Sequence, residues 1–282
     1  MKFEKLNICR IFVVSKIINN TKMAKSKLKF NVKEFTPLTD AQWAKIQVFV
    51  VTKRKIEKDL REVVNCILKV TRTGTQWRNI DAIYGPWESI YYYFRKWQKD
   101  GSFNAMLSYL VEQERVRQGR NPHATAGAID SQSVKIGTLI NKDVGIDGNK
   151  KINGRKRNIV VDTLGLPLAI HVCAANISDG IAGIELLPIL EKTSPKLTLI
   201  RADQAYKKTF TEAATWCHYT VEVTQKPPTE KGFVPQTGRW QVERSFGWGK
   251  FFRRLANDFE KTVESSVNFI QLVFISIILS KF

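Results

Sequence analysis

The stretch 128-AIDSQSVKIG-137 alternates apolar residues with small polar ones and carries a single acidic residue, Asp130. Alternation with a period of two predicts a β-strand, because successive side chains of a strand point to opposite faces of its sheet. One face of this strand would present the carboxylate of Asp130. A lone acid on a strand is usually solvated, so the role of Asp130 depends on what the rest of the chain places beside it.

The chain that follows this strand alternates between strand and helix patterns. Apolar, β-branched runs at 157–163 and 167–175 are joined by Leu-Gly-Leu, which predicts a hairpin. A hairpin followed by strand–helix–strand units predicts an α/β sheet with helices packed on it. The later units are helix patterns at 179–193 and 207–219, strand patterns at 196–206 and 220–226, and a long final helix from about Arg239.

The N-terminal half carries helix patterns instead. Thr39 is a good N-cap for a helix whose apolar residues recur at helical spacing as far as Val50. A second helix pattern covers 57–74, keeps its apolar residues from Leu60 onward on one face and would stop at Gly74. These patterns predict an all-helical region ahead of the sheet.

Two shorter runs, 76–83 and 88–99, are separated by Gly-Pro-Trp. Two helices joined by a tight turn that contains glycine predict a helix-turn-helix unit, in which Arg95 and Lys96 of the second helix would contact DNA. The alternative is a three-helix bundle in which the aromatic residues of the second run fill the core.

A polar run with Gly, Pro and Ala at 111–128 predicts a domain boundary near residue 120. The expected organisation is a basic, disordered arm at 1–35, a helical DNA-binding domain at 36–118 and an α/β domain at 119–282. Residues 1–22 differ in character from the remainder, and Met23 would make a natural alternative start, so the place of residues 1–22 in the native protein stays open.

The charge balance indicates a polyanionic partner. The chain has 282 residues with 45 Lys+Arg against 26 Asp+Glu, a net charge of +19. Nucleic acid is the commonest such partner, and an anionic membrane surface is its main rival. The apolar C-terminal stretch 269–282 is too short to span a bilayer and predicts a buried helix. The four cysteines are widely spaced, which excludes a zinc ribbon or a disulfide framework and fits a reducing cytoplasm.

Three acids fall at positions where chemistry is expected. Asp130 lies on the first strand, Asp203 follows a strand at its carboxyl end, and Glu243 lies early in the last helix. Carboxylates gathered from two strands and a helix form a ligand set for two hard divalent cations. Mg²⁺ suits such oxygen ligands, with Mn²⁺ as a substitute, and two ions support phosphodiester chemistry.

The last helix adds cations to this set. Arg239, Glu243 and Lys250 project within about 60° of one another on a helix, so the acid could bind metal while the two cations bind phosphates. An ordinary Arg–Glu salt bridge is the alternative. The surplus of positive charge that favours the phosphate interpretation comes from Arg244, Arg253 and Arg254.

Other charged residues receive less specific predictions. Lys150–Arg157 reads as a loop with five Lys and Arg residues, among them Arg155, Lys156 and Arg157, and predicts a DNA-phosphate patch. Asp162 is expected to bond its own backbone in the hairpin turn, and it is the best substitute if Asp130 is not catalytic. Asp147 is interpreted as a loop residue, and Glu185 and Glu260 as solvated residues of helices.

Seven ordered motifs carry a resemblance that covers 38–266. They are LTDAQW, LREVVNCILKVTRTGTQWRNI, GPWESIYYYFRKW, IDSQSVK, GIDGNKKINGRKRNIVVDTLGLPL, ADQAY and RWQVERSFGWGKFFRRLANDFEKTVESS. As an ordered set they resemble the insertion-sequence DDE transposases of family five. The resemblance implies an RNase H-like mixed sheet with flanking helices, preceded by a small all-α domain of helix-turn-helix type.

The resemblance also implies roles for single residues. It assigns the catalytic and metal-binding triad to Asp130, Asp203 and Glu243. Its signature Tyr-x₂-Arg-x₃-Glu-x₆-Lys is met by Arg239, Glu243 and Lys250, with Gln236 in place of the tyrosine. Two further departures are Ala205 for a glycine after the second acid, where Tyr206 is kept as an expected DNA contact, and Asn158 for a common histidine.

The implied function is that of a transposase that binds terminal inverted repeats and target DNA, cleaves the element ends and joins them to new DNA. A homo-oligomer, a dimer or higher, is expected on DNA in the bacterial cytoplasm, associated with the nucleoid, with no membrane partner. Two alternatives remain open: a non-catalytic DNA-binding protein or repressor derived from a transposase, and an RNase H-like nuclease without strand transfer.

Overall fold

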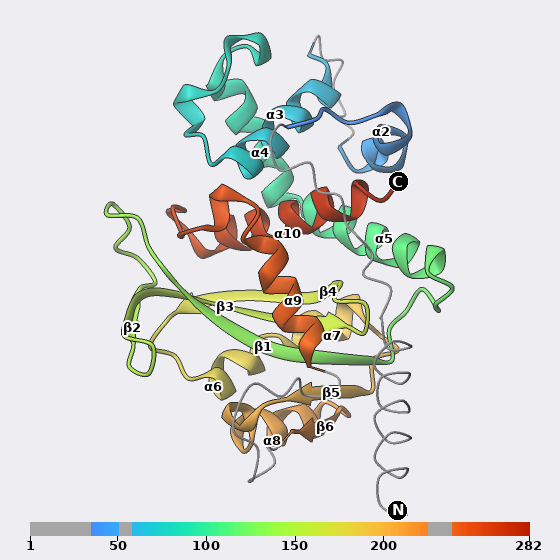
Figure 1. The fold of residues 1–282 in the computed structure, drawn as a ribbon, viewed down its shortest axis with the longest axis vertical. Coiled ribbons are helices and arrows are strands. Elements are labelled where there is room, and N and C mark those ends of the chain that lie inside the picture. Colours follow the sequence, from blue (N-terminus) through green and yellow to red (C-terminus); the bar gives the residue numbers. More distant parts are fainter. Residues whose placement is uncertain (1–34, 51–57, 225–238) are drawn as a thin grey trace, which may run out of the picture. The chain divides into compact units, whose positions relative to one another are not determined.

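A computed structural model describes residues 35–50, 58–224 and 239–282 (Figure 1). The arm predicted for residues 1–35 falls, except for Phe35, outside the described residues. Gln236, which stands where the family signature has a tyrosine, also lies outside them.

The helical region contains α2 (Asp40–Ile46), α3 (Leu60–Thr73), α4 (Trp87–Lys99) and α5 (Ser102–Arg117). Thr39 caps α2 as predicted: its hydroxyl accepts from the backbone N–H of Gln42, and the Gln42 side chain accepts from the backbone N–H of Thr39. Gly74 ends α3 in the left-handed conformation, also as predicted.

The prediction of an α-helix at 76–83 is wrong. This run forms two 3₁₀ turns, Trp77–Asn79 and Ala82–Tyr84, because Ile80 between them is extended and cannot continue a helix. The pair of α-helices expected for a helix-turn-helix is therefore absent at 76–99. Within α4, Tyr93, Phe94 and Trp97 are buried, as the bundle alternative expected, while Arg95 is exposed and Lys96 is half-buried.

A single mixed sheet forms the α/β region, as the sequence predicted. Its strands are β1 (Ala126–Lys135), β2 (Gly145–Asp147), β3 (Ile152–Asp162), β4 (Pro167–Ala174), β5 (Leu199–Ala202) and β6 (Thr220–Val223). β3 runs antiparallel to β1 on one edge and to β2 and β4 on the other. β1, β5 and β6 are parallel. This mixed α/β sheet with flanking helices, preceded by a helical region, confirms the fold class expected from the resemblance.

The remaining helices cover the sheet. They are α6 (Asp179–Ile184), α7 (Leu187–Thr193), α8 (Thr209–Trp216), α9 (Trp240–Gly249) and α10 (Val263–Leu279). α9 packs on β1 and β3, and α10 packs on β4 and on α5 (Figure 1). The helix predicted at 179–193 is split in two, with Pro188 in the first turn of α7, where a missing backbone N–H is tolerated.

The single long helix predicted from Arg239 is wrong, because α9 and α10 are separated by a connecting segment, residues 250–262. This segment contains a 3₁₀ turn at Arg253–Leu255, and Asp258 forms a bridge to Ile136 beyond the end of β1. α10 is buried along most of its length, which confirms the prediction of a buried C-terminal helix. None of the helices within the described ranges has the length and apolarity to cross a membrane. The boundary proposed near residue 120 stays a prediction.

The β3–β4 turn is built around Asp162. Its Oδ1 accepts from the backbone N–H groups of Leu164 (2.9 Å) and Leu166 (2.8 Å), so the prediction of a hairpin-turn acid is confirmed. Gly165 in this turn has φ +77°, and its carbonyl lies 2.7 Å from the Ser245 hydroxyl of α9. The turn is thus also the point where α9 contacts the hairpin.

Replacement of Gly165 by alanine should test this contact. A Cβ there would lie 2.9 Å from Ser245 Oγ and 3.1 Å from Arg244 Nη2. We expect Gly165→Ala to lower the free energy of unfolding by about 1–2 kcal/mol through the positive φ and by about 1–3 kcal/mol more through overpacking. Gly101→Ala is the matched control, because Gly101 has φ +78° but no neighbour within 4 Å of an added Cβ. Equal losses in the two variants, measured by denaturant unfolding, would contradict the close packing at the turn.

Candidate active site

Asp130 and Asp203 lie side by side because β1 and β5 are parallel neighbours. The register pairs Ala128 with Arg201, and the same register continued for two residues places Asp130 level with Asp203. Asp130 lies within β1, and Asp203 is the first residue after β5. The two acids predicted on strands are therefore brought together at one point of the sheet.

Arg239 reaches both carboxylates from the start of α9. Its Nη2 lies 3.7 Å from Asp130 Oδ2 and 3.5 Å from Asp203 Oδ2. The guanidinium is largely buried, whereas the two carboxylates keep 21% and 34% of their side-chain surface exposed. Arg239 was predicted to bind phosphates; in the described structure it is an ion-pair partner of the two acids.

Burial is the main influence on Asp130. It raises the pKa of this carboxyl to about 6, and the negative charge of Asp203 acts in the same direction. The backbone N–H of Ser131, at 2.7 Å, and the positive charge of Arg239 oppose the rise. The raised pKa of Asp130 therefore reflects the cost of burying its charge more than repulsion from Asp203.

Glu243, the third predicted acid, is exposed on α9, one helical turn after Arg239. In the part of the chain that the structure describes, no three His, Cys, Asp or Glu side chains gather closely enough to hold a metal ion. The structure thus brings together Asp130 and Asp203, with Glu243 on the helix that also carries Arg239. Lys250, the last signature residue, is exposed at the C-terminal end of α9.

The sequence patterns do not single out a further acid near the site, Asp179 at the start of α6. The Ser131 hydroxyl donates to Asp179 Oδ1 at 2.8 Å, and Lys156 Nζ lies 2.7 Å from the same oxygen. Its only sequence signal is an acid in the first turn of a helix. The phenol of Tyr206 lies near these acids. Its burial, together with the negative charges of Asp130, Asp179 and Asp203, raises its pKa well above the usual value.

The prediction of a DNA-phosphate loop at Arg155, Lys156 and Arg157 is wrong. All three lie within β3 and are buried, Arg155 completely. Burial lowers the pKa of Arg157 to about 10, and its Nη1 donates to the carbonyl of Leu255 at 2.8 Å. A run of charged residues resembles a loop in sequence, but here the charges are satisfied inside the protein.

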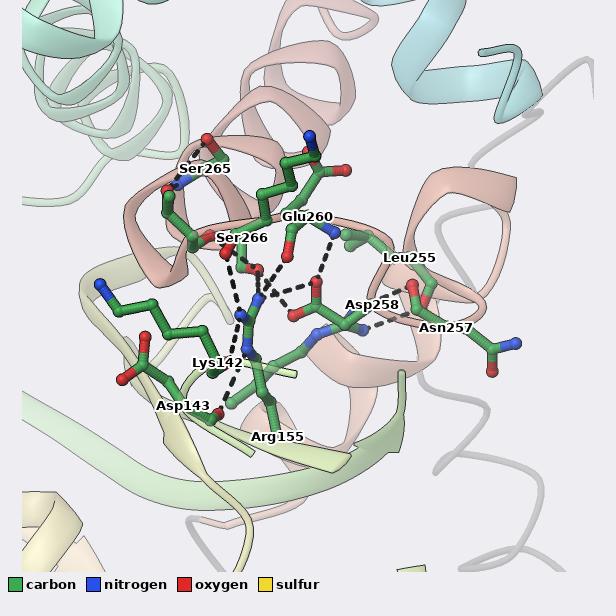
Figure 2. Close-up of polar contacts among 12 residues, drawn as sticks. Lys142, Asp143, Arg155, Leu255, Asn257, Asp258, Glu260, Ser265 and Ser266 are labelled. Carbon is green, nitrogen blue, oxygen red and sulfur yellow. Dashed lines mark hydrogen bonds and ion pairs between the residues drawn. The ribbon is translucent and has the colours of Figure 1, made fainter. Parts of the chain in front are cut away.

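Figure 2 shows how Arg155 is satisfied. Its Nη1 donates to Glu260 O (2.8 Å) and Ser266 Oγ (3.1 Å) and lies 3.3 Å from Asp258 Oδ1. Its Nη2 donates to Lys142 O at 2.8 Å. One guanidinium therefore joins the loop before β2 to the segment between α9 and α10, which fixes the path of the chain between these helices.

Four other predicted roles, those of Arg254, Glu260, Tyr206 and Asp147, are corrected. Arg254 is buried, and its Nε donates to Glu260 Oε1 at 2.7 Å, so Arg254 is not an exposed DNA contact and Glu260 is not a solvated helix residue. Tyr206 is 1% exposed and stacks edge-on against Phe210, so it cannot present its ring to DNA. Asp147 ends β2 and accepts from the backbone N–H groups of Asn149 and Lys150, both at 3.0 Å.

Several predicted DNA contacts do lie at the surface. Arg95, Lys250 and Arg253 are exposed, and Lys96 and Arg244 are half-buried. Glu185 is exposed, as expected. A role in DNA binding stays a prediction for these cations.

A mixed sheet with two acids on neighbouring parallel strands and an Arg-x₃-Glu pair on the covering helix defines a protein of the RNase H-like class. Residues 121–279, more than half of the chain, match the family described as "Transposase DDE domain", and residues 38–107 match "Putative transposase of IS4/5 family". The chain belongs to the DDE transposase family, in agreement with the resemblance found in its sequence.

A relative from Burkholderia cepacia, "Putative transposase for insertion sequence element IS402", is similar to part of the chain. The two are 30% identical over 129 residues, which cover 42% of this chain. The match spans 60% of the length of that relative.

The Arg155 contacts generate a stability prediction. Arg155→Met should lower the free energy of unfolding by about 3–5 kcal/mol, because it leaves Asp258 buried without its cation. Lys135→Gln, which removes one exposed charge at the end of β1, should change it by less than about 0.5 kcal/mol. Unchanged stability of Arg155→Met in denaturant unfolding, together with weaker DNA binding, would restore the DNA-patch interpretation.

Asp130 generates a prediction about pH. Because its folded pKa is raised from 3.8 to about 6, the folded state binds a proton more tightly than the unfolded state, and stability falls as pH rises from about 4 to 6. With a metal chelator present, Asp130→Asn should therefore raise the free energy of unfolding at pH 7.5 by about 2 kcal/mol. The gain should disappear below about pH 4. Glu185→Gln should show no such dependence, and a destabilised Asp130→Asn at pH 7.5 would disprove the unfavourable burial.

Proposed function

We propose that the chain is a DNA transposase that binds the terminal inverted repeats of its element, cleaves the ends and transfers the strands to target DNA. The observation that carries the proposal is that parallel strands bring Asp130, within β1, level with Asp203, just after β5, in a chain of the DDE transposase family. A two-metal phosphodiester reaction is the chemistry that such paired carboxylates support.

The residues at the site fit a hard divalent cation. Two partly exposed carboxylates lie close enough to share one guanidinium, and burial disfavours the ionised form of Asp130, a cost that a bound cation would offset. Oxygen donors of this kind suit Mg²⁺, and Mn²⁺ would substitute. Asp130 and Asp203 would hold two ions, with Glu243 from α9 as the third protein ligand.

Each residue has a role in this proposal. Bound cations would activate the attacking oxygen and stabilise the leaving one. Asp130 and Asp203 would fix the position of the reacting phosphate through the ions. Lys250 would bind a flanking phosphate, and Arg239 would move between the carboxylates and the DNA backbone.

The net charge of +19 supports DNA as the partner. Exposed cations on α4 and at the end of α9, including Arg95, Lys250 and Arg253, are available to phosphates. Because two element ends must be processed together, we expect a dimer or a higher oligomer on DNA.

Cleavage of DNA that carries the element ends tests the proposal. Purified protein should nick this DNA with Mg²⁺ or Mn²⁺ and join pre-cut 3′-hydroxyl ends to target DNA. Asp130→Asn, Asp203→Asn and Glu243→Gln should each lower the cleavage rate by about 100-fold or more, because charge stabilisation by the ions is worth several kcal/mol. Glu185→Gln, which changes the exposed acid just after α6, is the control and should keep the wild-type rate.

Two outcomes would replace the proposal. Binding to end DNA that persists in a chelator, with no nicking in any divalent metal, would identify a non-catalytic DNA-binding protein or repressor. Nicking without joining of pre-cut ends would identify an RNase H-like nuclease that lacks strand transfer.

A further inference from the structure

Two adjacent side chains attach α9 to the β3–β4 turn. Arg244 Nη2 donates to the carbonyl of Leu164 at 2.7 Å. The Ser245 hydroxyl lies 2.7 Å from the carbonyl of Gly165 and 2.8 Å from that of Gln241 within α9. Both acceptors of the turn are backbone groups, so the contact depends on the geometry of the turn and not on its side chains.

Arg244 is also held between two indole rings. Its guanidinium carbon lies 4.3 Å from the ring centroid of Trp240 and 4.8 Å from that of Trp248. These residues are spaced four apart, so all three share one side of α9. A planar guanidinium between two rings has its orientation fixed, and little of it remains free to turn toward another partner.

The turn that accepts Arg244 is itself rigid. Asp162 binds the turn backbone through Oδ1, and its Oδ2 pairs with Arg115 of α5. Arg115 in turn donates to the carbonyl of Asn121 at 2.8 Å. Both members of the pair are buried. The β3–β4 turn, which α9 contacts, is thus anchored to α5 through Arg115 as well as to β3.

The rotation of α9 about its axis decides where its acid points. Glu243 lies one turn after Arg239, so the two project from the same side of the helix, and Arg239 reaches Asp130 and Asp203 from there. Arg244 and Ser245 lie about 100° and 200° around the helix axis from Glu243 and contact the β3–β4 turn. We infer that Arg244 is a positioning residue, which fixes the rotation of α9 so that Glu243 stays on the side from which Arg239 reaches the paired acids, and that it is not a DNA-phosphate contact.

This inference rests on the proposed function, in which Glu243 is a metal ligand. The positioning role and the phosphate-binding role expected from the sequence require different chemical groups at residue 244. A phosphate contact needs a positive charge at residue 244, whereas a positioning residue needs the planar guanidinium that stacks on two rings and donates to Leu164.

Arg244→Lys separates the two roles, because it keeps the charge and loses the planar group. We expect its cleavage rate at saturating end DNA to fall about 10- to 100-fold, since misplacement of a reacting group by about 1 Å has effects of this size. The Mg²⁺ concentration for half-maximal cleavage should rise, while the Kd for end DNA should stay within about two-fold of wild type. Wild-type cleavage by Arg244→Lys would overturn the inference.

Arg244→Met removes the charge and provides a readout that does not depend on catalysis. The positioning role predicts that the log–log slope of DNA affinity against salt stays unchanged, whereas loss of a phosphate contact would reduce it by about one. Lys196→Gln, an exposed cation between α7 and β5, is the control for removal of one charge. A weaker Kd with a reduced slope in Arg244→Met alone would overturn the inference.

The second contact gives an independent pair of variants. Ser245→Ala should lower the cleavage rate in the same way as Arg244→Lys, and Ser245→Thr, which keeps the hydroxyl, should retain more activity. Unfolding midpoints within a few degrees of wild type would separate a positioning effect from general destabilisation. If wild-type protein itself fails to cleave end DNA, the proposed function fails; if it cleaves and both pairs of variants cleave normally, only the positioning inference fails.

Discussion

The parallel pairing of β1 with β5 is the constraint on which the candidate site depends. It holds two carboxylates at the same level of the sheet, within reach of one guanidinium. Arg239 offsets the repulsion that Asp203 exerts on Asp130, but burial still dominates and raises the pKa of Asp130. The fold therefore stores unfavourable electrostatic energy at one place, as expected of a site that is completed by a positively charged partner.

The basic character of the chain has two different origins in the structure. Some cations are exposed and available to a polyanion, whereas Arg155, Lys156 and Arg157 form the interior of β3. These buried cations bind carboxylates and backbone carbonyls of segments far away in sequence, as Figure 2 shows for Arg155. Net charge alone thus overstates the surface potential, and the path of the chain between α9 and α10 depends on charges that the sequence pattern assigned to DNA binding.

Most of the sheet could be predicted from the sequence because its strands have local signals. β1 shows alternation, the β3–β4 hairpin has Gly165 at a position that needs positive φ, and Asp203 directly follows β5. The same holds for α2 and α3, which have a cap residue and a terminal glycine. The rule that sites lie at the carboxyl ends of strands singled out Asp203, whereas Asp130 was recognised only as an acid on the first strand.

The remainder could not be predicted because it depends on long-range contacts. The charged run in β3 has no apolar alternation, and only its partners at 255–266 reveal that it is buried. The break between α9 and α10 is set by those same contacts, and Asp179 joins the site through Ser131 and Lys156 from other elements. The run at 76–83 has helical composition, but it is shorter than the helices around it and folds as 3₁₀ turns.

Binding of Mn²⁺ to the DNA-free chain, followed by electron paramagnetic resonance, tests most directly the claim that the paired acids form a cation site. We expect saturable binding by wild-type protein and its loss in Asp203→Asn, with Glu185→Gln, which removes an exposed acid away from the pair, binding as wild type does. Equal binding by wild-type protein and Asp203→Asn would show that the two acids do not act as a joint cation site, and would contradict the account.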